Sequence, residues 1–331
     1  MSLFKTPLES QDSSLATVSL HALSAGHFSL PEEQFVRPAS PGARKTVPSL
    51  CFLLQHTCAS SGNTTRIVFD LGLRRDVKRY SEPIQRHVST RQPMSTDPDV
   101  VKSLRAGGLT PNDIDVVIYS HVHWDHVGEP RDFLRSTFVV GHGSVDVLAG
   151  KSSTLRGGHS FFEADLLDLS RTIELLDPIC NQDEIEDGKI ASSLSSTSAN
   201  FSRPWQALDI FPSALDIFND GSLYIVDAPG HLTGHVNLLA LIKDGGGVIR
   251  WVYLAGDACH DRRIMRHERE ISEWHDASGH LCCIHADRPK AEATIERIRA
   301  LETNGVEVIF AHDVEWEKQT GNQKRFFGSA Q

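Results

Sequence analysis

The segment of residues 120–126, Ser-His-Val-His-Trp-Asp-His, constrains this chain more than any other stretch. It directly follows an apolar run that is typical of a buried strand. Side chains two residues apart in an extended segment point to the same side, so His121 and His123 can bind one metal ion together. Asp125 and His126 are adjacent and diverge, which suits a second ion nearby. Imidazole and carboxylate groups favour zinc, iron, manganese or cobalt over a metal that prefers thiolates.

Composition limits the classes of protein to which this chain can belong. Its 331 residues allow one large domain or two small ones, and 40% hydrophobic residues suffice for a core. A net charge of −10 argues against a nucleic-acid partner. No apolar run approaches the roughly 20 residues that a membrane-spanning helix needs, and the first 19 residues lack a signal-peptide pattern. We therefore expect neither a nucleic acid nor a membrane as partner.

The cysteines show no spacing that is typical of a metal site or a disulfide framework. A chain of this length does not need disulfides to fold, so we expect reduced cysteines and a cytoplasmic location. The six are Cys51, Cys58, Cys180, Cys259, Cys282 and Cys283.

Apolar periodicity predicts two series of strands, each with helices after it. The first series is expected at residues 16–25, 48–55, 65–70 and 115–120, with a loop at 31–46 and a helix at 97–107. The second is expected at 222–227, 235–243, 248–256 and 306–311, with a helix at 288–302. Turn residues at 60–63 and 244–247 predict hairpins. Because no linker is visible, we expect a single α/β domain over residues 1–331, with its core at about 16–315.

The segment of residues 150–215 is the least regular part of the chain. Residues 190–203 are rich in serine, threonine and asparagine. Long irregular stretches in compact domains are often functional, so we expect residues 190–215 to cover the site as a lid that selects the substrate.

Several polar residues lie at or just after the C-terminal ends of predicted strands. Strand ends in stacked sheets meet at one edge, so these side chains can gather there. Metal ligands are often assembled in this way, far apart in the sequence and rigidly held. The residues are Asp70, His121, His231, Asp257 and His312.

The motifs around these residues resemble those of the metallo-β-lactamase superfamily. Residues 121–126 match the HxHxDH signature, and residues 229–235, Pro-Gly-His-Leu-Thr-Gly-His, resemble the GHTxGH segment. Asp257 resembles the bridging aspartate, and His312 resembles the final ligand. The resemblance covers about residues 45–315. It implies an αββα sandwich, with two mixed β-sheets packed face to face, helices outside, and metals at the edge between the sheets.

The resemblance also implies a ligand set for two divalent metal ions per chain, with zinc expected and iron, manganese or cobalt as alternatives. One ion would take His121, His123 and His231, the other would take Asp125, His126 and His312, and Asp257 would bridge them. His235 is the alternative to His231, but we expect it to lie behind the ligands. Asp70 would orient a ligand imidazole.

Within the superfamily the chain is most similar to the N-acyl-homoserine lactonases, which implies quorum quenching. The similarity rests on residues 312–315, His-Asp-Val-Glu, and on the motif spacing. One position departs from that group, because His260 stands where bacterial homoserine lactonases place a tyrosine.

A two-metal site lowers the pKa of a shared water, and the resulting hydroxide can attack the carbonyl of a lactone or ester. Asp125, Asp257 and His260 are the expected catalytic residues. The expected substrate-binding residues are Trp124, Phe201 and Trp205. The expected partner is a small-molecule lactone or ester, and a homodimer is left open.

Other functions remain open at this point. A thioesterase of the glyoxalase II type is the nearest alternative, and a persulfide dioxygenase with a single iron is another. The net charge of −10 disfavours a nuclease. The presence of all seven ligand positions disfavours a scaffold without catalytic function.

Overall fold

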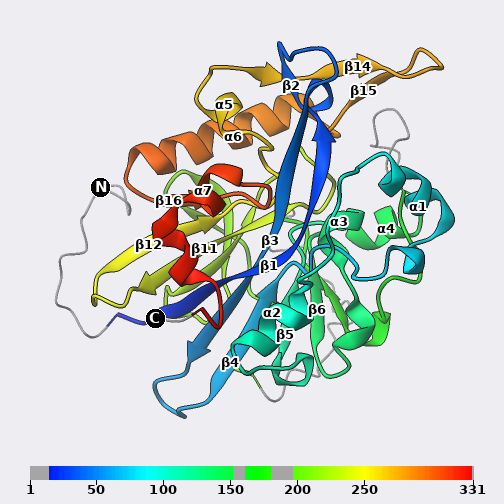
Figure 1. Cartoon of the computed structure of the whole chain (residues 1–331). Coiled ribbons are helices and arrows are strands. Elements are labelled where there is room, and N and C mark those ends of the chain that lie inside the picture. Colours follow the sequence, from blue (N-terminus) through cyan, green and yellow to red (C-terminus); the bar gives the residue numbers. More distant parts are fainter. Residues whose placement is uncertain (1–14, 152–160, 180–196, 330–331) are drawn as a thin grey trace.

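Two long antiparallel strands, β1 (Val18–Pro31) and β3 (Arg44–Thr57), run through the centre of the molecule (Figure 1). The structure is a computed structural model and describes residues 15–151, 161–179 and 197–329. Strand β4 (Thr64–Phe69) continues from β3 as the expected hairpin. The strand expected at residues 16–25 is therefore confirmed but longer.

The remaining strands extend this pair on both sides. The sheet order is β7-β6-β5-β4-β3-β1-β11-β10-β9-β8, and β12 pairs with β11 and β16. The strands after β4 are β5 (Val116–Ile118), β6 (Thr137–Val140), β7 (Thr172–Glu174), β8 (Gln206–Leu208), β9 (Phe211–Asp216), β10 (Leu223–Asp227), β11 (Val236–Lys243), β12 (Ile249–Leu254) and β16 (Glu307–Ile309). Two separate pairs join β2 (Val36–Arg37) to β13 (Glu270–Ile271) and β14 (Glu273–His275) to β15 (Leu281–Cys283).

The two halves of the large sheet face each other across one core. A single parallel pair, Val18 with Ile242, connects β1 to β11, so the two expected sheets are hydrogen-bonded into one. Alternate residues point to opposite faces of a strand. In accordance with this, Phe52 of β3 and Leu238 of β11 lie in the same buried cluster between the halves.

Helices cover the outer face of each half. Val68 of β4 packs with Leu104 of α2, and Leu239 of β11 packs with Ile298 of α6, in two further buried clusters. The helices are α1 (Glu82–Ser89), α2 (Val100–Ala106), α3 (Trp124–Val127), α4 (Ser144–Leu148), α5 (Arg262–Met265), α6 (Arg288–Thr303) and α7 (Val314–Lys318). Figure 1 shows α6 and α2 on opposite sides of the central strands. This arrangement is the expected αββα sandwich.

Two regions that were expected to be irregular contain regular structure. The expected loop at residues 31–46 contains a 3-10 helix, η1 (Glu32–Gln34), and β2. Within the described part of residues 150–215, β7, β8 and β9 belong to the large sheet. These short strands depend on partners far away in the sequence, which local patterns do not show. Residues 152–160 and 180–196 lie outside the described residues.

The described residues contain neither a disulfide nor a helix suited to crossing a membrane. Of the six cysteines, the described residues include all but Cys180, and none of these five takes part in a disulfide. Within the described part of the chain, none of the helices has the length and apolar character needed to cross a membrane.

Candidate metal centre

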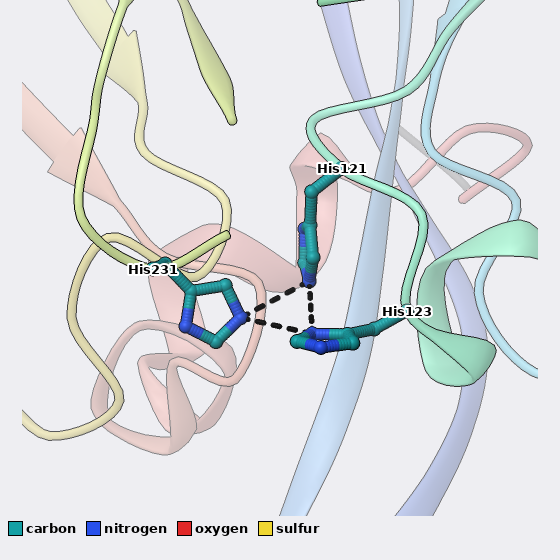
Figure 2. Close-up of side chains that lie close together, drawn as sticks. All are labelled: His121, His123 and His231. Carbon is teal, nitrogen blue, oxygen red and sulfur yellow. Dashed lines mark hydrogen bonds between the residues drawn. The ribbon is translucent and has the colours of Figure 1, made fainter. Parts of the chain in front are cut away.

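Three histidine side chains from two loops meet at one point (Figure 2). His121 and His123 come from the loop after β5, and His231 comes from the turn between β10 and β11. Their ring nitrogens are close together: His121 Nε2 lies 2.8 Å from His123 Nδ1, His123 Nδ1 lies 3.0 Å from His231 Nε2, and His231 Nε2 lies 3.2 Å from His121 Nε2.

Such a triangle of nitrogens fits a cation better than it fits hydrogen bonding. A neutral imidazole carries one N–H, so protons cannot satisfy three mutually close nitrogens that point to a common centre. Burial and the neighbouring imidazoles lower the pKa values of His121 and His231 well below the usual value. Burial lowers the pKa of His123 to about 4. These rings are therefore neutral at physiological pH, which is the form that binds a metal.

A second group surrounds the carboxylate of Asp257. Its Oδ1 lies 3.2 Å from Nε2 of both His126 and His312, and His312 Nε2 also lies 3.3 Å from Asp125 Oδ2. Its other oxygen, Oδ2, lies 3.6 Å from His231 Nε2 and 3.9 Å from His121 Nε2. The two oxygens of one carboxylate thus face the two groups.

The protonation of the second group indicates that a positive charge belongs there. Burial alone would lower the pKa of His312, but the carboxylates of Asp257 and Asp125 raise it to about 10. Burial would raise the pKa of Asp125, but the hydrogen bond from His312 lowers it to about 2. The two carboxylates thus favour positive charge at this point, and a divalent cation supplies such charge. The chemistry of these donors therefore fits a metal ion.

Surrounding groups hold the ligand rings in orientation. Asp70 accepts hydrogen bonds from the backbone N–H of Ser120 (2.7 Å) and from its hydroxyl (2.7 Å), and it lies 2.8 Å from His126 Nδ1. His312 Nδ1 donates to the carbonyl oxygen of Pro48 at 2.8 Å. In both rings the occupied Nδ1 leaves Nε2 directed at the centre. Asp70 thus contacts a ring as the sequence suggested.

His235 lies behind the centre. Its Nε2 accepts a hydrogen bond from the backbone N–H of Asp257 at 3.2 Å. It belongs to none of the possible metal-binding groups among the described residues, whereas His231 belongs to the triangle.

A further histidine, which the sequence did not suggest, joins the site. His285 is completely buried, and its Nδ1 lies 3.3 Å from Nδ1 of His231. It also forms a possible metal-binding group with His231 and His260. Backbone hydrogen bonds from Ala286 to the carbonyl of His231 and from Asp287 to that of Gly230, both 2.9 Å, bring it there. Its position two residues before the cap of α6 is the signal that could have drawn attention to it.

His260 faces both the centre and a cavity of about 380 Å³. Its Nε2 lies 3.0 Å from Asp257 Oδ2. The cavity is also lined by Trp124 and by residues of β1, η1, the end of α1 and the β14–β15 segment. Its metal-centre wall consists of His123, Asp125, His231, Asp257, His260 and His312.

Two of the expected substrate-binding residues do not line this cavity. Phe201 is buried in the core between the halves of the sheet, where Trp205 packs against the same cluster. The Trp205 indole N–H donates to the carbonyl of Leu176 at 2.8 Å. Aromatic residues near an irregular segment serve equally well as core, so substrate binding by Phe201 and Trp205 stays a prediction without support from this cavity. Among the described residues, none from 161–179 or 197–215 lines the cavity, although Phe162 stacks on His123 with ring centroids 5.8 Å apart.

Comparison with known proteins identifies similar sequences. Residues 44–249 match the model of the metallo-beta-lactamase superfamily. The chain is 28% identical over 323 residues to the cytochrome P450 monooxygenase mpaDE of Penicillium roqueforti, covering 91% of this chain and 34% of that protein. It is 28% identical over 235 residues to the gamma-lactamase FDB1 of Fusarium pseudograminearum, covering 70% of this chain and 50% of that protein. The chain thus spans about a third of mpaDE and half of FDB1.

Solved structures share the fold at low sequence identity. An N-acyl homoserine lactone hydrolase with N-hexanoyl-L-homoserine at its catalytic metal centre has a TM-score of 0.60 and 17% identity, covering 92% of this chain and 96% of that one. AidC, a dizinc quorum-quenching lactonase, has a TM-score of 0.53 and 14% identity, covering 90% and 88%.

Proposed function

Because this chain belongs to the metallo-β-lactamase superfamily, we propose that it is a metal-dependent hydrolase that opens a lactone or cleaves a related ester. The observation that carries the proposal is the carboxylate of Asp257, whose two oxygens face two separate ligand groups beside a cavity. A dinuclear site next to a cavity is one arrangement that supports hydrolysis of a carbonyl substrate.

We assign the ligands from the geometry of the two groups. His121, His123 and His231 would hold one ion, Asp257 would bridge, and the other ion would be held by Asp125, His126 and His312. Zinc suits this set of nitrogen and oxygen ligands. The likeness in fold to the dizinc lactonase AidC also supports zinc as the metal. When bound, the ions supply Lewis acidity and lower the pKa of a water molecule.

The side chains around the centre orient the ligand rings and transfer protons. Asp70 and the Pro48 carbonyl keep the His126 and His312 rings turned inward. His260 lines the cavity with its Nε2 against Asp257 Oδ2. A proton shared between these two atoms can pass to the oxygen that leaves when the acyl bond breaks. Trp124 provides an apolar wall for the acyl or ring portion of the substrate.

A hydrolysis panel combined with elemental analysis tests the proposal. The panel contains acyl-homoserine lactones of several chain lengths, aryl esters, S-lactoylglutathione, a β-lactam and a γ-lactam. We expect two metal ions per chain and turnover of lactones or esters, with metal content reduced by His123→Ala and by Asp257→Ala. Full activity with a single bound ion would contradict the dinuclear site.

A lactam is the second candidate substrate. The similarity to the gamma-lactamase FDB1 favours it, and the same centre could attack an amide carbonyl. Amide hydrolysis places a stronger demand on protonation of the leaving group, so turnover of the γ-lactam should depend on His260 more than ester turnover does. A cytoplasmic location, a homodimer and a role in quorum quenching stay predictions.

A further inference from the structure

The wall of the cavity that adjoins α1 carries a buried arginine. Arg91 lies two residues after the end of α1, has only 9% of its surface exposed, and lines the cavity together with Gln34 and Arg44. Its backbone carbonyl accepts a hydrogen bond from the N–H of Ser29 in β1 at 2.9 Å, which fixes it against the central strands.

The guanidinium of Arg91 has hydrogen-bonding capacity left over. Its Nε donates to His87 Nε2 at 3.2 Å, and its Nη1 donates to Gln34 Oε1 at 3.0 Å. Among the described residues, none accepts a hydrogen bond from its Nη2, and no carboxylate lies within 4.0 Å of the group. By contrast Arg74, which is equally buried, pairs with Glu163 at 2.6 Å.

Arg44 adds a second cation at the mouth of the same wall. It is exposed, and its Nη2 donates to the carbonyl oxygens of Ser29 at 3.0 Å and Thr90 at 2.8 Å. Within the described chain it too lacks a carboxylate partner within 4.0 Å. The carboxylates that line the cavity, Asp125 and Asp257, are directed at imidazoles of the metal centre.

Aromatic rings connect this wall to the centre. Phe28 contacts His312 and Trp124, with centroid separations of 5.2 Å in both cases. Trp124 in turn contacts His87, which accepts the hydrogen bond from Arg91, at 5.7 Å. The space between the centre and Arg91 is therefore bordered by apolar ring faces.

We infer that the substrate carries a carboxylate that binds to Arg91 and Arg44, separated by an apolar or aromatic body from the bond that is hydrolysed. This inference rests on the proposed function and narrows it to anionic substrates. A planar guanidinium with free N–H groups matches the geometry of a carboxylate, and a charge-assisted hydrogen bond in a buried site is strong. A neutral substrate would leave the free donors of Arg91 without a partner.

Binding of unreactive ligands tests the inference without relying on turnover. Calorimetric titration of the metal-loaded protein with 4-butoxybenzoate and 4-butoxybenzamide compares a carboxylate with a neutral group of the same shape. We expect the benzoate to bind roughly 10- to 100-fold more tightly, the range typical of a hydrogen bond to a charged group. Arg91→Gln should abolish this preference and Arg91→Lys should restore part of it. Arg86→Gln, on the exposed side of α1, is the matched control and should keep the preference.

Arg44→Gln serves as a second test in case the Arg91 variants do not fold, because Arg44 is exposed and its substitution should leave the fold intact. This variant should reduce the preference for the benzoate by a smaller factor than Arg91→Gln does. Equal binding of both ligands to the wild type would overturn the inference. So would a preference that survives substitution of Arg91, or of Arg44 if the Arg91 variants do not fold, because the benzoate would then bind elsewhere, for example at the metal ions.

Turnover separates this inference from the proposed function. The substrates are the butanoate esters of 4-hydroxybenzoate and 4-hydroxybenzamide, and the ratio of their kcat/KM values is compared between the wild type and Arg91→Gln. Electronic differences between the leaving groups cancel in this comparison. Hydrolysis of both esters with an unchanged ratio would refute the carboxylate site and leave the hydrolase intact. Tighter binding of the benzoate without hydrolysis of any ester would support the carboxylate site and refute the proposed hydrolase function.

Discussion

At the scale of single residues, we propose that His260 supplies the proton that the leaving oxygen takes up. Its Nε2 lies 3.0 Å from Asp257 Oδ2, and it lines the cavity. We predict that His260→Ala lowers kcat by roughly 10²–10⁴-fold for esters and lactones with poor alkoxide leaving groups, the range typical of general acid assistance. It should have little effect on p-nitrophenyl esters, whose leaving group needs no proton. Steady-state kinetics on both substrate types would measure this difference.

Two observations control the interpretation of His260. His260→Tyr should recover part of the lactone activity, because a phenol can donate to the same oxygen. Elemental analysis of His260→Ala should still find two ions. An equal loss on both substrate types would assign His260 to shaping the cavity, and loss of an ion would make it a ligand, as its grouping with His231 and His285 allows.

Asp227, at the end of β10, links stability to pH. Burial, with the nearby charge of Asp177, raises its pKa from 3.8 to about 6. The folded state therefore binds this proton more tightly than the unfolded state, and stability is lost as the pH rises through 4 to 6. We predict that Asp227→Asn is more stable than the wild type by about 1–2 kcal/mol at pH 8 and not at pH 4. Denaturant unfolding of the metal-free proteins at both pH values measures it, and an equal difference at the two values would contradict the linkage.

At the scale of elements, helix α6 holds the turn that carries His231. The Thr294 hydroxyl donates to the carbonyl of Pro229 at 2.8 Å, and the N–H of Asp287 donates to that of Gly230 at 2.9 Å. Gly230 has φ +130°, and a Cβ on it would lie 2.2 Å from the backbone nitrogen of Ala291. Only glycine allows the helix to approach so closely, and this approach directs His231 at the centre.

The N-cap residue of α6, Asp287, therefore both stabilises the helix and supports the turn that carries His231. The Asp287 side chain accepts a hydrogen bond from the backbone N–H of Lys290 at 3.1 Å. We predict that Asp287→Ala destabilises the fold by about 1 kcal/mol, whereas Asp287→Ser, which can cap as well, costs less. Chemical unfolding of the three proteins tests this. If the serine variant were as unstable as the alanine variant, the cap would not be the source of the loss.

At the scale of the whole molecule, the metal centre joins parts of the chain that are distant in sequence. His121 follows β5, Asp257 follows β12, and His312 follows β16. An ion bound at this candidate centre would hold these elements together, and it would stabilise the fold to the extent that it binds the folded protein more tightly than the unfolded chain. Removal of the metal should therefore lower the unfolding temperature, because an ion present at 100 times its dissociation constant adds about 2.7 kcal/mol.

Thermal unfolding with and without a chelator measures this contribution. Chelator that has been saturated with zinc beforehand is the control and should leave the unfolding temperature unchanged. Asp257→Ala should show a smaller response to chelator, because the bridging carboxylate is missing. A wild-type protein that unfolds at the same temperature in all conditions would exclude a structural contribution of the metal.

Local patterns were sufficient for features that depend on neighbouring residues. The spacing of His121 and His123 places both on one side of an extended segment, and Asp287 and Gly305 mark the limits of α6. Apolar alternation predicted the central strands. The motif resemblance then supplied the sandwich and the seven candidate ligands, all of which the structure brings together.

The sequence by itself determined the central strands and the residues available to hold metal, since strand periodicity and motif spacing are short-range properties of the chain, and the resemblance of those motifs to a known superfamily implied the αββα sandwich. Only the tertiary structure decided which side chains meet across those elements. The tertiary structure places His231 rather than His235 in the triangle with His121 and His123. It also buries His285 beside His231 and places Arg91 on the cavity wall. It buries Phe201 in the core and packs the partly buried Trp205 against it. The physical reason is that these contacts join segments from opposite halves of the sheet or from distant loops, and their packing is set by the whole fold rather than by any local pattern.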